Sequence, residues 1–453
     1  MKYHDLIKKY NIPVPRYTSY PTVPVWKENQ PDVEKWKNHV HQSFKQSNES
    51  KGISLYLHMP YCEKLCYYCG CNTNITKKHR DVEVDYIEAV LTEWKLYLDI
   101  FNTSPKIAEI HIGGGTPTFF SPEHLRKLLE EILGTATVHE NHSFSFEAHP
   151  MNTKEEHLKV LSRLGFDRVS FGIQDFDPHV QKKINRIQDF NSIKKITELS
   201  RKHQFKSINY DLIYGLPFQH EGSIKETVEK VSLLMPERIA FYSYAHIPWK
   251  KAGQRKYTEK DLPTDEYKRN LYELGKELLL ELGYKNIAMD HFALPEDELY
   301  QAYKMNQLHR NFMGYTVTNT ELMIGLGASS ISDSGTAYVQ NNREVNDYKE
   351  TILSKELQFI KGHFLSRKEK LVKNLILSLI CHDEALIPSE IHKSLTKERK
   401  KALKEMENEG LIQLIDNRIL LQEAGKVFIR NICAVFDPYY QLNNVEQQFS
   451  KSI

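Results

Sequence analysis

The chain has 453 residues, too many for one ordinary domain, so we expect a large body with a smaller attachment. Its 61 Lys and Arg nearly balance 59 Asp and Glu, and a net charge of +2 excludes a global field that attracts nucleic acid or membranes. Residues 1–17 lack the apolar core of a signal peptide, and no apolar run reaches the roughly 18 residues of a membrane span. The sequence therefore predicts a cytoplasmic protein that acts on a small molecule, without nucleic acid or membrane partners.

Short apolar runs alternate with helix-length amphipathic segments between about residues 50 and 290. The runs are rich in β-branched and aromatic residues and predict strands at 53–58, 108–115, 144–150, 168–174, 208–215 and 238–246. The segments 85–101 and 121–133 predict helices, the second capped by Ser121 and followed by proline. Alternating strands and helices indicate βαβ units, and six units favour a complete or incomplete barrel over a flat sheet.

Polar or small residues follow the apolar part of the predicted strands. They are residues 113–116, Glu147, Gln174, Asp211 and residues 245–246. The carboxyl ends of the strands share one face of a parallel barrel, and active sites lie on that face. We therefore expect these residues to surround one site.

After about residue 360 the pattern changes to helices followed by two short apolar runs around Asp416 and Asn417, which predicts a small hairpin. The charged tract 397–410 predicts a helix that ends at Gly410. Together these elements resemble a winged-helix shape. Nucleic-acid contact is one role for such a shape, but the near-neutral chain favours a packing or lid domain.

Four of the six cysteines, Cys62, Cys66, Cys69 and Cys71, lie within ten residues. In a reducing cytosol such cysteines bind metals or react, whereas disulfides are rare. A structural zinc site usually takes two separated pairs, and a redox pair would not lie inside a triplet. Three cysteines can instead hold three irons of a [4Fe–4S] cluster and leave the fourth iron open to a substrate or cofactor. Closed ligation that includes Cys71 is the alternative, through a tight turn that Gly70 permits.

Residues 111–118, HIGGGTPT, place three consecutive glycines after a predicted strand. Glycines expose backbone amides and carbonyls, so a ligand can approach closely. The spacing fits neither a Rossmann fingerprint nor a P-loop, which argues against a nucleotide phosphate. A plain strand-to-helix turn is the alternative, but next to an open iron the glycines suit the ammonium or carboxylate of an amino acid.

The CxxxCxxC loop with an aromatic residue before its last cysteine, followed by GGGTPT, resembles the radical S-adenosylmethionine superfamily. More closely, the chain resembles the oxygen-independent coproporphyrinogen III oxidases of that superfamily. Similar motifs occur along nearly the whole chain in the family's order. They are PRYTSYPT (15–22), YLHMPYCEKLCYYCGCN (56–72), VSFGIQDF (169–176), DLIYGLP (211–217), MDHFALP (289–295), LHRNFMGYT (308–316) and RNICAVFD (430–437).

The resemblance implies an α/β fold, namely an incomplete (β/α)6 three-quarter TIM-like barrel with an additional, mostly α-helical and winged-helix-like C-terminal domain. It also implies three parts. We expect an N-terminal substrate-covering segment at 1–50, the catalytic barrel and its extension at 51–360, and the C-terminal helical domain at 361–453.

The resemblance also implies a [4Fe–4S] cluster held by Cys62, Cys66 and Cys69, with an exchangeable S-adenosylmethionine on the open iron and a second S-adenosylmethionine nearby. Residues that match contacts to the first molecule are Tyr56, Gly114, Glu147 and Ile331. Those that match contacts to the second are Tyr68, Gly115, Thr116, Gln174, Arg186, Asp211 and Ala245. The alternative role of Glu147 and Asp211 is that of ordinary strand-end carboxylates, and the alternative role of Ile331 and Ala245 is core packing.

The implied activity is the oxygen-independent oxidative decarboxylation of two propionates of coproporphyrinogen III to vinyl groups, which gives protoporphyrinogen IX in haem biosynthesis. A reduced cluster passes an electron to S-adenosylmethionine, and a 5′-deoxyadenosyl radical takes hydrogen from the β-carbon of a propionate. The protein positions the reactants and excludes water and oxygen. We expect a monomer that receives electrons from a donor such as flavodoxin or ferredoxin.

Four cationic residues in similar motifs are candidates for the substrate's carboxylates, because guanidinium pairs well with carboxylate. They are Arg16, Arg255, His291 and Arg310. Surface or structural charges are their alternative roles.

Three residues depart from the family's usual pattern. His149 replaces an aspartate of other branches and changes the charge of its strand end, Val14 replaces a common glycine before Pro15, and Tyr68 replaces phenylalanine but keeps an aromatic face. The rival hypotheses are a haem-binding, chaperone-like paralogue, a radical methyltransferase on the same scaffold, and a nucleic-acid-binding iron–sulfur protein. PRYTSYPT, Cys71 and the second cofactor's residues favour the oxidase over the paralogue.

Overall fold

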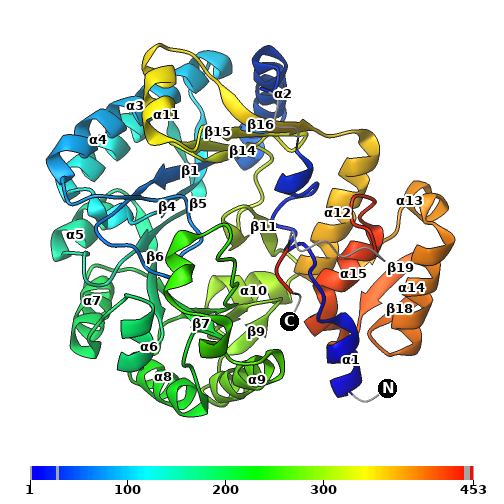
Figure 1. The fold of residues 1–453 in the computed structure, drawn as a ribbon. Coiled ribbons are helices and arrows are strands. Elements are labelled where there is room, and N and C mark those ends of the chain that lie inside the picture. The colour runs from blue at the N-terminus through cyan, green and yellow to red at the C-terminus, as the bar shows by residue number, and fades with distance from the viewer. Residues whose placement is uncertain (1–2, 27–29, 443–448, 452–453) are drawn as a thin grey trace.

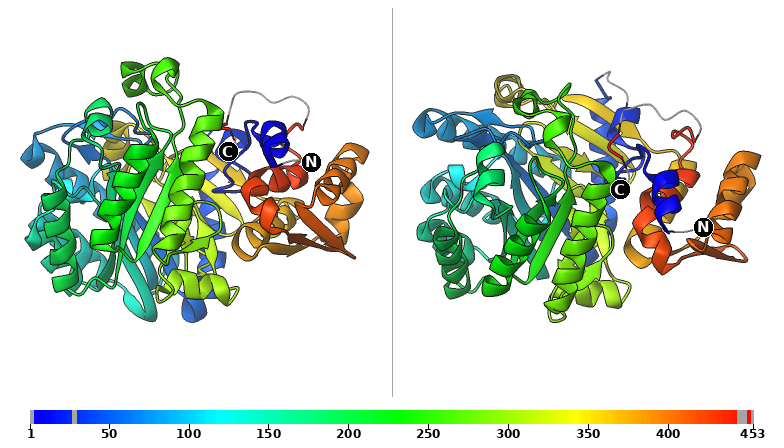
Figure 2. Two further views of the ribbon diagram at one scale, coloured as in Figure 1. Left: turned by 90° about the horizontal axis from the view of Figure 1, so that it is seen from below. Right: turned by 60° about the horizontal axis from the view of Figure 1, so that its bottom comes forward.

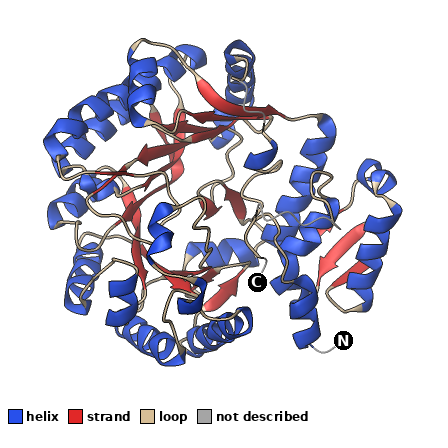
Figure 3. Cartoon of the chain, in the orientation of Figure 1, coloured by secondary structure: helices blue, strands red, loops and turns tan. Residues whose placement is uncertain are grey.

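A computed structural model describes residues 3–26, 30–442 and 449–451 (Figure 1). Its centre is a run of seven parallel strands in one large, curved sheet (Figure 3). In spatial order these are β13 (Met323–Leu326), β1 (Ile53–Met59), β4 (Lys106–Gly114), β5 (Thr137–Ala148), β6 (Phe166–Gln174), β7 (Ser207–Tyr214) and β8 (Arg238–Ser243). The last six confirm the strands predicted from the sequence, and the alternation of these strands with helices confirms the βαβ pattern.

Short antiparallel strands extend the sheet at both edges. One edge adds β14 (Ile331–Asp333), β15 (Ala337–Asn341) and β16 (Phe359–Phe364), and the other adds β10 (His291–Ala293) and β9 (Lys285–Ile287). Within the described residues the outermost strands, β16 and β9, do not pair with each other. The barrel is therefore incomplete, as the resemblance implied, whereas the strand pattern alone left its closure open.

Helices cover the outer face of the sheet (Figures 1 and 3). They are α2 (Val33–Lys51), α3 (His79–Phe101), α4 (Pro122–Leu133), α5 (Glu155–Arg163), α7 (Phe190–Lys202), α8 (Glu221–Leu234), α9 (Asp265–Glu281) and α11 (Val345–Leu353). The short α6 (Pro178–Lys183) instead packs Val180 in a smaller cluster that includes Tyr67 and Tyr68, close to the cysteines. Helix α4 illustrates the local cause, since the Ser121 side chain accepts a bond from a first-turn amide and proline starts the helix. Leu125, Leu128, Leu129 and Ile132 recur at helical spacing and are buried.

Alternation along β1 sends one set of side chains outward and the other into the barrel. Leu55 and Leu57 belong to the large apolar core. Between them Tyr56 stacks on His111 of β4, at a ring separation of 6.1 Å, and its hydroxyl lies 3.0 Å from Nδ1 of His58. The alternation therefore makes the inside of the barrel polar while its outside packs against the helices.

The C-terminal region has the order of a winged helix: α12 (Arg367–His382), β17 (Glu384–Leu386), α13 (Ser389–Ser394), α14 (Lys397–Asn408), β18 (Ile412–Ile415) and β19 (Arg418–Leu421). Its three strands form an antiparallel sheet in the order β17-β19-β18. The hairpin turns at Asp416, whose φ is 53°, and Gly410 follows α14 with a φ of 73°. The expected hairpin and helix end are confirmed. The 3-10 helix η5 (Glu423–Phe428) and helix α15 (Ile429–Phe436) complete the region.

The N-terminal residues join both parts of the molecule. Helix α1 (Tyr3–Tyr10) lies beside the C-terminal region (Figure 2), where the Tyr10 hydroxyl donates to Glu409 at 2.6 Å. Helix α2 instead packs Trp36 and Phe44 into the barrel's core. The division expected at residues 50 and 360 stays a prediction. Helix α2 ends at Lys51, and β16 spans 359–364 within the large sheet.

Three further elements are small. Helix α10 (Glu298–Lys304) follows β10, the hairpin β11 (His309–Asn311) with β12 (Gly314–Thr316) lies inside the barrel's opening, and β2 (Tyr61–Cys62) pairs with β3 (Asn74–Ile75). The Thr316 hydroxyl donates to Glu109 of β4 at 2.7 Å, which ties the hairpin to the barrel. Among the residues described, no helix combines the length and apolar character that crossing a membrane requires.

A buried carboxylate, Glu93 of α3, holds the strand ends near β13. It accepts hydrogen bonds from the Tyr348 hydroxyl at 2.6 Å, the Asn341 amide at 2.7 Å and the Gly327 N–H at 2.9 Å. Burial outweighs these bonds and raises the pKa of Glu93 to about 7. The network links one helix to three separate stretches of chain.

Replacing Glu93 by Ala is expected to lower the free energy of unfolding by about 3 kcal/mol, because three buried donors lose their acceptor. The folded-state pKa exceeds that of the unfolded chain, so the native protein binds more protons and the contribution of Glu93 falls as pH rises from 4.5 to about 7. Urea denaturation of both proteins at several pH values measures the difference. Glu88→Ala, exposed on the same helix, is the control, and equal losses in both variants would refute the assignment.

Candidate active site

A cavity of about 1070 Å³ opens at the carboxyl ends of the parallel strands. It brings together residues from the cysteine loop, the glycine turn and strands β5 to β8. The predicted site residues that line it are Cys62, Cys66, Tyr68, Cys69, Gly114, Gly115, Thr116, Glu147, Gln174, Arg186 and Asp211. Residues 114–116, Glu147, Gln174 and Asp211 thus meet at one site, as expected, whereas residues 245–246 do not line it.

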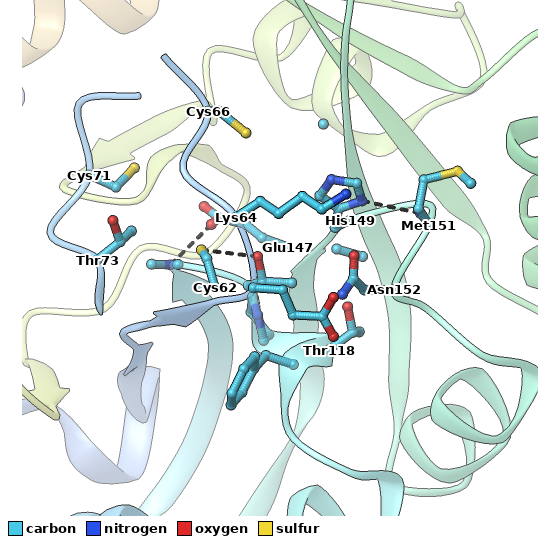
Figure 4. Close-up of a pocket in the computed structure, with 18 of the residues that line it drawn as sticks. Cys62, Lys64, Cys66, Cys71, Thr73, Thr118, Glu147, His149, Met151 and Asn152 are labelled. Carbon is cyan, nitrogen blue, oxygen red and sulfur yellow. Dashed lines mark hydrogen bonds between the residues drawn. The ribbon is translucent and has the colours of Figure 1, made fainter. Parts of the chain in front are cut away.

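The cysteine loop is closed at its base by the pairing of β2 with β3. The thiol of Cys62 lies 3.2 Å from the Thr116 hydroxyl, and that of Cys66 accepts a bond from Arg186 Nη1 at 3.4 Å. Figure 4 shows Cys62, Cys66 and Cys71 projecting from this loop, with His149 on the opposite side and Glu147 between them. The thiols therefore surround a common space, and all are free of disulfides.

The electrostatic environment differs among these thiols. Burial raises the pKa of the Cys62 thiol to about 11. A hydrogen bond from the Cys71 thiol lowers the pKa of Cys69 to about 6, and the same contact raises that of Cys71. The guanidinium of Arg186 lies beside the loop, where its Nη1 donates a hydrogen bond to the Cys66 sulfur. Of the three loop thiols whose pKa is shifted, Cys69 is therefore the one that carries negative charge most readily.

The glycine turn packs directly against the cysteine loop. The N–H of Gly115 donates to the Met59 carbonyl at 2.7 Å, and that of Thr116 donates to the Tyr61 carbonyl at 3.0 Å. A Cβ at Gly115 would lie 2.8 Å from the backbone of Pro60, closer than real Cβ atoms approach. Only glycine allows this contact, so the glycines position the loop as well as exposing backbone to a ligand.

Glu147 lies at the end of β5, beside the glycine turn. It accepts a bond from the Gly114 N–H at 3.1 Å and faces Nε2 of His111 at 3.5 Å, whose Nδ1 lies 2.8 Å from the Ser145 hydroxyl. Burial opposes ionisation, but the bonds from His111 and Gly114 outweigh it and lower the pKa of Glu147. An ionised carboxylate therefore faces the cavity near the cysteines, suited to an ammonium group.

Asp211 lies at the opposite part of the cavity, on β7. It accepts hydrogen bonds from Ser170 at 3.0 Å and Asn209 at 2.8 Å. Burial and the nearby charge of Glu147 raise the pKa of Asp211 to about 6. The Arg186 side chain donates to the Gly172 carbonyl at 2.7 Å. This bond holds it on β6, between the strands that carry Glu147 and Asp211.

Three predicted cofactor contacts lie outside the lining of this cavity. Tyr56 lies behind Glu147, next to the glycine turn. Ile331 packs with the aromatic group around Trp26. The Ala245 carbonyl accepts a bond from Gln254 Nε2 at 3.2 Å, and the same amide donates to the Tyr68 carbonyl at 3.1 Å.

The four substrate candidates do not come together in the cavity. Arg255 is exposed and donates to the Pro248 carbonyl, whereas Arg16 lies 3.9 Å from Asp290 at the junction with the C-terminal region. His291 faces an inner cavity of about 210 Å³, and burial lowers its pKa to about 4. Arg310 is buried against the Tyr315 ring, 4.9 Å from its centre. Their substrate roles stay predictions.

Comparison with known proteins agrees with this geometry. Residues 56–231 match the radical SAM superfamily. The chain is 36% identical to the oxygen-independent coproporphyrinogen III oxidase of Pseudomonas aeruginosa and 35% identical to that of Escherichia coli, each over 99% of this chain and 98% of the relative. The chain belongs to the oxygen-independent coproporphyrinogen III oxidases.

A solved structure supports the same conclusion. The coproporphyrinogen III oxidase HemN from Escherichia coli, described as a radical SAM enzyme, superimposes with a TM-score of 0.87 at 33% identity, over 96% of this chain and 98% of that one. This similarity confirms the incomplete barrel with its helical C-terminal region. Membership of the radical SAM superfamily gives this oxidase a [4Fe–4S] cluster and S-adenosylmethionine.

The donor set of this oxidase fits an iron–sulfur cluster. Among the described residues, no three His, Cys, Asp or Glu side chains converge as ligands of a single metal ion. A cluster instead distributes its cysteine ligands over separate irons, so its ligands surround a space. Cys62, Cys66 and Cys69 do so, and Arg186 supplies positive charge beside them.

Some residues that shape the oxidase site were missed by sequence reasoning. His111 holds Glu147 and Tyr242 lines the cavity, while Gln254 ties two loops together. His111 lies in the HIGGG motif, two residues before the first glycine. This position close to the predicted ligand-binding turn was a signal that it belongs to the site. Gln254 has no local signal, because its partners are backbone carbonyls of distant loops. His149 does line the cavity, and burial together with Arg186 and Lys64 lowers its pKa to about 2.

Proposed function

We propose that this chain catalyses the oxidative decarboxylation of two propionates of coproporphyrinogen III to vinyl groups, giving protoporphyrinogen IX in haem biosynthesis without oxygen. The relatives that match nearly its whole length carry the name of this activity. The observation that carries the proposal is the meeting of three cysteines, the glycine turn and Glu147 around one cavity. Each propionate loses a hydrogen atom, carbon dioxide and one electron.

Cys62, Cys66 and Cys69 hold the cluster in this proposal and leave one iron without a protein ligand. The bound cluster and S-adenosylmethionine together supply a 5′-deoxyadenosyl radical for hydrogen abstraction. Tyr56, Gly114, Glu147 and Ile331 hold the first S-adenosylmethionine. Support comes from Glu147, whose lowered pKa keeps it ionised to pair with the methionyl ammonium, and from Gly114, which allows close approach.

A second S-adenosylmethionine lies across the cavity in this proposal. The residues that hold it are Tyr68, Gly115, Thr116, Gln174, Arg186, Asp211 and Ala245. Asp211 offers a buried carboxylate to a positively charged ligand, and Gln254 keeps Tyr68 and Ala245 adjacent. The large volume of the cavity supports two ligands.

The remaining partners follow from the same proposal. A one-electron carrier such as flavodoxin or ferredoxin reduces the cluster. The chain acts in the cytoplasm as a monomer, without nucleic acid or membrane. Arg16, Arg255, His291 and Arg310 remain candidates for the propionates, from separate places around the barrel.

The test is anaerobic turnover after cluster reconstitution, with reductant, S-adenosylmethionine and coproporphyrinogen III. We expect carbon dioxide, 5′-deoxyadenosine and protoporphyrinogen. An intact cluster without decarboxylation, together with stable haem binding, would point to the chaperone-like paralogue. Transfer of a labelled methyl group from S-adenosylmethionine to the product would point to a methyltransferase.

A further inference from the structure

Three adjoining segments, one of which is the cysteine loop, form a rim of the molecule. They are the cysteine loop itself at 62–71, residues 182–189, which include the last two residues of helix α6, and residues 248–256, which include η3 (Ala252–Lys256). We call these three segments the rim face. The rim face takes no part in lining the deep cavity except through the cysteine loop and residues 185–187.

Hydrogen bonds hold residues 182–189 against the cysteine loop. The Tyr67 N–H donates to the Ile184 carbonyl at 2.9 Å, and the Asn185 amide donates to the Leu65 carbonyl at 2.8 Å. These bonds fix the end of helix α6 beside the loop that carries the predicted iron ligands.

Residues 248–256 contact the cysteine loop from its other end. Nζ of Lys251 donates to the Cys71 carbonyl at 3.0 Å, and Gln254 donates to the Tyr68 carbonyl at 3.1 Å. A Cβ at Gly253 would lie 3.3 Å from the Leu65 side chain, so the two segments touch. The rim face is therefore one continuous surface rather than three separate loops.

Large apolar side chains are exposed on the rim face. Leu65 is 37%, Trp249 56% and Ile187 72% exposed, one from each segment. Exposed apolar groups that gather within a polar surround are typical of protein-binding sites. Each of the three adjoining segments thus exposes one large apolar side chain, and packing within this chain leaves these side chains at least partly uncovered.

The charges of the rim face are strongly unequal. Its three segments contain eight Lys or Arg and two acidic residues, in a chain whose net charge is only +2. Lys64, Lys182, Lys183, Lys250, Arg255 and Lys256 are exposed among them. A positive field around an apolar centre attracts and orients an acidic partner, and it repels a second copy of the same surface.

We propose that the rim face docks a small acidic protein that carries single electrons and delivers them to the cysteine loop. This inference rests on the proposed function, because only a reducible cluster behind the loop needs such a partner. In the transfer the carrier is oxidised by one electron and the cluster is reduced by one, and no bond forms or breaks. The apolar centre supplies contact area, and the lysines supply steering and orientation.

The test compares two electron sources for the holoenzyme, reduced flavodoxin and dithionite. The variant Lys182→Glu/Lys250→Glu/Lys256→Glu is expected to lose about tenfold in flavodoxin-supported decarboxylation at low salt, because its steering charges are reversed. Its dithionite-supported rate should stay within about twofold of wild type, since a small reductant needs no docking surface. Added salt should slow the wild-type flavodoxin reaction and leave the dithionite reaction unchanged.

The matched control is Lys45→Glu/Lys225→Glu/Lys400→Glu, which changes the net charge equally on exposed positions of α2, α8 and α14. It should keep both activities. A second variant, Trp249→Ser, should also lose flavodoxin-supported rate alone, because Trp249 is exposed on the rim face and does not line the cavity. Calorimetric titration of each holoenzyme with flavodoxin measures binding without turnover. The affinities of wild type, rim variants and control should follow the same order as their flavodoxin-supported rates.

Unchanged flavodoxin binding and rate in the rim variants would overturn the proposal. So would an equal loss in the control variant. A raised KM for coproporphyrinogen III with dithionite would instead assign the rim face to the anionic substrate. Absence of dithionite-supported decarboxylation in the wild type would refute the proposed function, whereas flavodoxin titration would still decide the docking surface.

Discussion

Replacing Cys69 by Ser is expected to remove the iron–sulfur cluster and all turnover together. Three thiolates around one space are the minimum that holds three irons, and serine oxygen is a poor ligand for this cluster. Iron and sulfide content after anaerobic reconstitution, with the visible absorption of the cluster, measures the loss. The cluster-free variant should retain the thermal stability of the cluster-free wild type within a few degrees, because serine nearly matches cysteine in size and neither protein then gains stability from a bound cluster.

Cys71→Ser is the matched control, since it changes the same atom two residues away. It is expected to keep wild-type iron content, because the open-cluster proposal gives Cys71 no iron. Full activity in Cys69→Ser would contradict the ligand assignment. Loss of iron in Cys71→Ser would restore the hypothesis of closed ligation by four cysteines.

Replacing Asp211 by Asn is expected to reduce the S-adenosylmethionine bound per chain from two molecules to one, measured by anaerobic equilibrium dialysis. The change removes the buried carboxylate that the proposal pairs with the cationic second molecule, and a charge-assisted contact of this kind contributes about 2 kcal/mol. Because the reaction is proposed to need both molecules, decarboxylation at subsaturating S-adenosylmethionine should fall by about thirtyfold, the factor that about 2 kcal/mol corresponds to.

The protonation of Asp211 also predicts a pH dependence. Its pKa is raised to about 6 by burial and by the charge of Glu147, and only the ionised form pairs with a cation. Binding of the second molecule should therefore weaken by up to about tenfold for each pH unit below 6, and this limb should be absent in Asp211→Asn.

Glu147→Gln is the reciprocal variant, because Glu147 is assigned to the first molecule. It should abolish the perturbation of the cluster's electron paramagnetic resonance spectrum by S-adenosylmethionine, whereas Asp211→Asn should retain it. Two molecules bound by Asp211→Asn, with wild-type affinity, would refute the second site. Equal spectral effects in both variants would show that the two carboxylates share one ligand.

The parallel core was predictable from sequence because each strand carries a local signal. Apolar runs such as 53–58 and 208–215 are long enough to predict buried strands, and polar residues mark their carboxyl ends. Strand β13 was missed. Its four residues, Met323–Leu326, carry little local signal, and they become a strand only by pairing with β1, distant in sequence.

The site was predictable where a motif supplies both the residue and its neighbours. The cysteine loop and the glycine turn are contiguous stretches, so their meeting follows from the order of β1 and β4 in the sheet. The environment of Glu147 was not predictable, because His111 reaches it from another strand. The positions of the cationic candidates were not predictable either. Arg16 and Arg310 lie in recognisable motifs, yet Arg16 lies near Asp290 and Arg310 against the Tyr315 ring.

The most direct test of the account follows the hydrogen atom. Coproporphyrinogen III deuterated at the β-carbons of its propionates is incubated anaerobically with the reconstituted, reduced protein and S-adenosylmethionine. We expect 5′-deoxyadenosine that has gained deuterium, together with carbon dioxide and protoporphyrinogen. Protoporphyrinogen formed alongside unlabelled 5′-deoxyadenosine, or no decarboxylation by protein with a full cluster, would contradict it.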